Sequence, residues 1–162
     1  MYFWNIKKLK EELIRDGLSQ RSMFMYILVS VLLAQLFLAI AFLFPSKDAI
    51  NAIDYIKLLI DLSVVGAGTY LSFYANGAGS GVQFAERYFS ISFVVGLRFI
   101  PLLIPLALLT GFAVGIVKIA FGITSVSSGI HYATLALVRV WLVVMYWRIV
   151  THINDVAKAA HA

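Results

Sequence analysis

The feature that most constrains this chain is the length of its apolar runs. Residues 23–44 contain no charged side chain and a single amide, Gln35. A helix needs roughly 20 apolar residues to cross the hydrocarbon core of a bilayer, which is about 30 Å thick. Of the 162 residues, 62% are hydrophobic and 13% are charged, whereas a soluble domain is about a quarter charged. The sequence therefore predicts an all-α integral membrane protein.

Four runs of this kind follow one another along the chain. We predict transmembrane helices at residues 23–44, 55–75, 90–117 and 131–150. The third run is the longest, about 42 Å as a straight helix, and it contains Pro101 and Pro105. We therefore expect this helix to be tilted or kinked, or to begin among the lipid headgroups. The short connections predict one compact four-helix bundle at residues 23–150, followed by a short cytoplasmic tail at residues 151–162.

Basic residues are distributed unequally between the two sides of this topology. The N-terminal segment, residues 76–89 and the C-terminal end of the chain from residue 148 onward carry Lys7, Lys8, Lys10, Arg15, Arg21, Arg87, Arg148 and Lys158. The opposite side carries Lys47, Lys57 and Lys118. Positively charged loops stay in the cytoplasm, so we expect both termini to be cytoplasmic. The short loops are typical of small proteins of the prokaryotic inner (plasma) membrane. The net charge of +5 then reflects topology and lipid-headgroup contact, and we predict no binding to nucleic acid.

Residues 1–22 precede the first run and predict an amphipathic helix. Phe3, Ile6, Leu9 and Leu13 recur at steps of three or four, and charged residues fill much of the remaining surface. A helix with this pattern lies at the bilayer surface with its apolar side in the lipid. We interpret it as an interfacial anchor that fixes the topology of the first span. The alternative is a docking surface for a partner protein or for anionic lipid.

Three charged residues inside the runs, Asp61, Arg98 and Arg139, are the candidate functional residues. A charge at the bilayer centre costs about 2.5–3.5 kcal/mol on insertion scales, so such residues pair, face the bundle interior or reach for the interface. Asp61 and Arg139 lie at matching depths, roughly 9–12 Å from the outer side, and we expect them to form an ion pair. Arg98 is expected to reach the cytoplasmic headgroups. The pair either fixes the helix register or acts as a proton or ion relay.

Small and polar residues mark candidate packing surfaces within the runs. Gly111 and Gly115 form a GxxxG motif in the third run, and Gly68 and Ser72 share one face of the second. Small residues let the backbones of membrane helices approach closely. These positions therefore predict helix contacts within the chain or between copies. Gln35 is expected to hydrogen-bond with another helix or with another copy.

The sequence offers little for catalysis. It contains no cysteine, which excludes thiolate metal sites and cysteine nucleophiles. His131 and His152 stand at opposite ends of the fourth run, about 31 Å apart along a helix, too far to bind one metal ion. We therefore predict no catalytic residue, no metal and no cofactor. Glu86, Arg87 and Tyr88 form a weak cluster that would suit a lipid-acting enzyme.

These patterns favour a non-enzymatic accessory or scaffold subunit of a membrane complex. Its expected partners are the lipid bilayer and another membrane protein or a second copy of the chain. The alternative is a small oligomeric transporter or channel for an ion or small solute, using Asp61 with Arg98 or Arg139.

Overall fold

The computed structural model describes residues 2, 4–43, 52–121 and 128–160, and within these ranges the chain is helical, with no strand. The helices are α1 (Ile6–Arg15), α2 (Gln20–Leu43), α3 (Ala52–Ala75), the 3-10 helix η1 (Ala78–Ser80), α4 (Phe84–Phe99), α5 (Leu103–Phe121) and α6 (Ser128–Ala160). Helices α2, α3 and α6 are long and apolar enough to cross a membrane, and α4 with α5 adds a fourth if this bent pair is one span. The all-helical prediction is confirmed for the described ranges.

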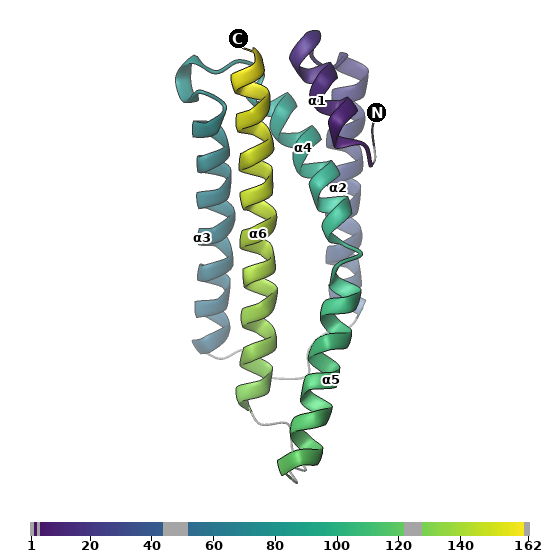
Figure 1. Ribbon diagram of the computed structural model, residues 1–162, viewed down its shortest axis with the longest axis vertical. Coiled ribbons are helices and arrows are strands. Elements are labelled where there is room, and N and C mark those ends of the chain that lie inside the picture. The colour runs from purple at the N-terminus through teal and green to yellow at the C-terminus, as the bar shows by residue number, and fades with distance from the viewer. Residues whose placement is uncertain (1, 3, 44–51, 122–127, 161–162) are drawn as a thin grey trace.

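Helix α6 stands at the centre of the arrangement. It packs against α3, α4 and α1, while α2 packs against α4. Figure 1 shows α3 and α4 on opposite sides of α6, with α1 at the end where α6 finishes. Buried apolar side chains gather at that end, in a core formed by Ile6, Leu9, Leu13, Tyr26, Ile91, Phe93, Val94, Val95, Ile149, Ile153 and Val156.

The first helix corrects one expectation. Ile6, Leu9 and Leu13 of α1 are 6%, 0% and 2% exposed, because this face of the helix packs against α4 and α6. The prediction that these residues dip into lipid is therefore wrong. An amphipathic pattern specifies that one face avoids water, and here protein covers that face.

The last helix is longer than predicted. The segment expected to be a tail, residues 151–162, continues α6 as far as Ala160. Ile153 and Val156 are fully buried in the core beside α1. Lys10 of α1 also forms an ion pair with Asp155 of α6, with 2.6 Å between Nζ and Oδ2. The last turns of α6 are thus held by the N-terminal helix.

The third predicted run divides into two helices. Helix α4 starts at Phe84, ahead of the predicted residue 90, and a bend of 44° separates it from α5. Proline has no N–H group to donate, so the i to i−4 ladder fails near Pro101 and Pro105. Hydrogen bonds that span three residues instead of four replace it. Leu103 N donates to Ile100 O (3.0 Å), and Ile104 N donates to Pro101 O (3.3 Å). The expected kink therefore lies at residues 100–102.

Candidate functional site

Asp61 and Arg139 form an ion pair between α3 and α6. Arg139 Nη2 donates a hydrogen bond to Asp61 Oδ2 at 3.1 Å, and Arg139 Nε lies within ion-pair distance of Asp61 Oδ1, also at 3.1 Å. A hydrogen bond between two charged groups is stronger than one between neutral groups. The Asp61 side chain is 44% exposed and that of Arg139 is 19% exposed. The structure thus brings together the two residues that depth counting paired, with the carboxylate as the more open partner.

Arg98 lies apart from this pair. Its guanidinium donates through both Nε and Nη2 to the backbone oxygen of Trp4, the Nε bond being 3.2 Å long. Trp4 precedes α1, so Arg98 ties the start of the chain to α4. A shared relay through all three charged residues therefore has no geometric basis in the described part of the chain.

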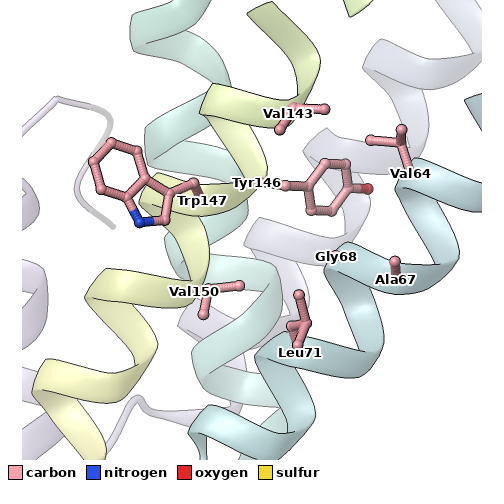
Figure 2. Close-up of a pocket in the computed structure, with 8 residues that line it drawn as sticks. All are labelled: Val64, Ala67, Gly68, Leu71, Val143, Tyr146, Trp147 and Val150. Carbon is pink, nitrogen blue, oxygen red and sulfur yellow. The ribbon is translucent and has the colours of Figure 1, made fainter. Parts of the chain in front are cut away.

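A groove lies between the same two helices, about one turn beyond the ion pair. It is lined by Val64, Ala67, Gly68 and Leu71 of α3 and Val143, Tyr146, Trp147 and Val150 of α6, around a volume of about 240 Å³. We call this groove, together with Asp61 and Arg139, which stand three and four residues before Val64 and Val143, the α3–α6 seam. Figure 2 shows the Tyr146 ring directed from α6 towards α3, whereas the Trp147 indole points away from α3.

Gly68 is a position of close approach between α3 and α6. A Cβ atom at Gly68 would lie 2.2 Å from Tyr146 Cδ1 and 2.5 Å from Tyr146 Cγ. The ring of Tyr146 therefore occupies the space that any side chain at residue 68 would need. Ser72, one turn further on, is fully buried, and its hydroxyl donates back to the Gly68 carbonyl at 2.8 Å.

A cluster of three hydroxyl groups, one from each of three helices, lies next to the groove. Thr69 Oγ1 of α3 and the Tyr88 hydroxyl of α4 are 2.9 Å apart, and the Tyr146 hydroxyl of α6 lies close enough to interact with both. No sequence pattern pointed to this cluster. Tyrosines suit both membrane interfaces and packed cores, so only knowledge of which helices are neighbours reveals it.

A second polar group, the terminal polar layer, consists of Asn76, Glu86, Arg87 and Ser90. Arg87 is 2% exposed, and its Nη1 donates to Asn76 Oδ1 at 2.9 Å. Asn76 Nδ2 in turn donates to the carbonyl of Val82 at 3.0 Å. Arg87 thereby fastens the turn between α3 and α4. Among the described residues, Arg87 Nε has no hydrogen-bond partner.

The turn depends on one close backbone approach. A Cβ atom at Gly81 would lie 2.0 Å from the Asn76 carbonyl oxygen, so only glycine fits there. Glu86 accepts a hydrogen bond from the backbone N–H of Leu18, and Tyr88 bonds with Thr69. The three residues considered for lipid chemistry thus each hold a structural contact.

The N-terminal segment is fastened by tyrosines. Tyr26 of α2 is fully buried; its hydroxyl accepts from Tyr2 N at 2.7 Å and donates to Tyr2 O at 3.2 Å. A hydrogen bond with Glu12, together with the charge of that carboxylate, raises the pKa of the Tyr2 phenol above its ordinary value. These contacts hold the chain ahead of α1 against α2.

The remaining predicted packing residues lie on open surfaces. Gly111 and Gly115 line a shallow groove on α5 with Leu108, Phe112, Ile116 and Ile119. In the described part of the chain, α5 has no extensive contact with another helix. Gln35 is exposed on α2.

The described residues contain no group of three or more histidine or acidic side chains placed to hold a metal ion. Comparison with protein-family models, with curated proteins and with solved structures gives no match. The geometry of the chain is therefore the basis for any functional proposal.

Proposed function

We propose that this chain is embedded in a bilayer by four spans, formed by α2, α3, α4 with α5, and α6, as a compact bundle whose two termini are cytoplasmic. The imbalance of basic residues supports this orientation, and short loops favour a prokaryotic inner (plasma) membrane. The exposed apolar side chains support insertion. Large hydrophobic residues are open along α2, α3, α5 and α6, and contiguous apolar surface of this extent is rare on soluble monomers.

Within that membrane, the chain acts as a non-enzymatic accessory or scaffold subunit of a larger complex. The observation that carries this proposal is the open surface of α5. Leu109, Phe112 and Ile119 are 67%, 72% and 86% exposed, and Gly111 and Gly115 lie on the same helix. Close helix packing in lipid relies on small residues and van der Waals contact. Because α5 carries this motif and has no extensive contact with another helix among the described residues, a partner outside the chain is favoured.

The polar interior supports a structural role. The Asp61–Arg139 pair joins α3 to α6, the hydroxyl cluster joins α3, α4 and α6, and the Arg87–Asn76 bond holds a turn. Each of these contacts links helices or fixes a connection. Such links set the register of the helices against one another, which is what a scaffold requires.

The decisive experiment combines mild detergent extraction with native sizing of a tagged chain. We expect a species larger than the monomer, and we expect Gly111→Leu with Gly115→Leu to reduce it. Gly66→Leu is the matched control, because residue 66 lies on α3 and a Cβ there meets no atom within 4 Å. The proposal would be contradicted if every form of the chain ran as a monomer, or if the α5 substitutions left the size of the assembly unchanged. Tags at the two termini that report opposite compartments would overturn the topology.

A small transporter or channel is the second candidate. It is favoured by the broken span at residues 100–102 and by the partly exposed carboxylate of Asp61. Broken helices form substrate sites in transporters. In proteoliposomes, ion or solute flux that falls on Asp61→Asn substitution supports this function. If Asp61→Asn leaves the flux unchanged, the transporter or channel function loses its support.

A further inference from the structure

We infer that the α3–α6 seam binds α2 of a second copy of this chain, with the Gln35 amide of one copy donating to the Asp61 carboxylate of the next. The inference rests on the proposed insertion into a bilayer and not on the proposed accessory role. It assigns a partner to two polar side chains that the single chain leaves open to hydrocarbon.

Gln35 points away from its own chain. Tyr26 and Leu33 pack into the core, and they mark the face of α2 that meets α4. At about 100° per residue, Gln35 lies on the opposite face of the helix from Tyr26. No hydrogen bond to Gln35 is present among the described residues, and the residue is exposed. An unsatisfied amide is costly in hydrocarbon, so an acceptor on a neighbouring copy would stabilise this side chain.

Asp61 has spare capacity to accept. A carboxylate offers about four lone-pair positions, and the hydrogen bond from Arg139 Nη2 takes one of them, on Oδ2. The side chain of Asp61 is 44% exposed, against 19% for Arg139. The open member of the pair is thus the acceptor, so the incoming group must be a donor. The Gln35 amide has two N–H donors.

The two residues match in depth. Gln35 lies eight residues before the end of α2 at Leu43, and Asp61 lies nine residues after the start of α3 at Ala52. These separations correspond to about 12 Å and about 14 Å along the helices. The expected topology puts both helix ends on the outer side, so copies standing upright in one bilayer present the amide and the carboxylate at nearly one level.

The seam also presents a small residue to a neighbouring helix. Six residues after Asp61, its α3 wall includes Ala67, which is exposed, and small residues allow close approach of a neighbouring helix. The outward stripe of α2 offers Leu28 and Val31, both exposed, to fill it. Figure 1 shows α2 and α3 on opposite sides of α6. The contact is therefore heterologous, and repetition builds a ring or a chain of copies.

Cysteine cross-linking tests this arrangement directly, because the chain contains no cysteine. Two differently tagged copies are co-expressed, one with Val31→Cys and one with Val64→Cys, and membranes are treated with a short bifunctional thiol reagent. We expect a cross-linked product that carries both tags. Leu33→Cys with Val64→Cys is the matched control, since residue 33 faces α4, and it should give no such product. Absence of the Val31–Val64 product, or equal yield from the control, overturns the inference.

Substitution of Gln35 provides the second measurement. Interhelical hydrogen bonds in membranes contribute about 0.6–1.7 kcal/mol, so Gln35→Leu should weaken association of labelled copies in lipid vesicles by roughly threefold to twentyfold. Leucine suits an exposed position on an apolar helix, so folding is preserved. Unchanged association, or dominant Val31–Val31 cross-links that indicate an α2–α2 contact, refutes the assignment. The α5 variants and the terminal tags report separately on the accessory role and on insertion.

Discussion

Replacement of Gly68 by alanine is the sharpest test of how α3 and α6 fit together. The new Cβ would lie 2.2 Å from Tyr146 Cδ1, and its next nearest neighbours are two further carbons of the same ring. Ordinary contact begins near 3.4 Å, so the ring must move by about an ångström, or the helices must separate. Overpacking of this kind costs about 1–3 kcal/mol. Alanine also gains about 0.8–1 kcal/mol of helix propensity over glycine, which partly masks the clash.

Gly66→Ala is the matched control for this effect. It lies on the same helix and gains the same propensity, but its Cβ meets no atom within 4 Å. We therefore expect Gly68→Ala to be less stable than Gly66→Ala by about 1–3 kcal/mol, measured by unfolding of the purified protein in detergent micelles. Because the clash is with the ring, Tyr146→Ala should remove the difference between the two glycine variants. Equal stability of Gly68→Ala and Gly66→Ala would refute the proposed close contact.

Two other perturbations address the ion pair and the first helix. Asp61→Arg or Arg139→Asp alone should lower the free energy of unfolding by about 1–3 kcal/mol, and with it the amount of folded protein. The loss is smaller than the about 3–5 kcal/mol of a fully buried pair, because Asp61 is 44% exposed. The double exchange should restore the folded protein, and a double variant no better than either single variant would contradict the pairing. Leu9→Ala should destabilise the fold by about 2–5 kcal/mol, since Leu9 is fully buried, whereas Ile14→Ala at an exposed position of the same helix should change stability by less than about 0.5 kcal/mol. Equal effects at residues 9 and 14 would indicate that α1 is not part of the core.

The positions of the long helices follow from hydropathy alone. In a bilayer, the backbone N–H and C=O groups of an uncharged run such as residues 23–44 must hydrogen-bond within the run, which favours a helix. Helix α2 occupies Gln20–Leu43. The break near Pro101 follows from the missing N–H of proline. The Asp61–Arg139 contact follows from depth counting once two helices are placed in one slab. Each of these inferences uses information that a single helix carries.

What could not be predicted depends on which helices are neighbours. Two contacts join segments that no local sequence pattern brings together. They are the close approach of the Tyr146 ring to Gly68 and the hydrogen bond between Arg87 and Asn76. The burial of Leu9 was missed for a related reason, because an apolar stripe has the same spacing whether lipid or protein covers it. The fourth predicted helix ended at residue 150, whereas α6 continues to Ala160. Lys10 provides Asp155 of this extension with a partner.

The distribution of packing along the molecule unites these observations. Core residues, the tyrosine contacts of the N-terminal segment and the terminal polar layer gather at the end that holds α1. Towards the other end, α5 lacks extensive contact in the described part of the chain, and its apolar side chains stay open. In the bilayer proposed above, no hydrophobic force would drive helices together, so that half would need polar contacts or neighbouring chains to fix its geometry. Asp61 with Arg139 supplies one such contact, and the exposed faces of α2 and α5 are consistent with the proposal of a subunit completed by assembly.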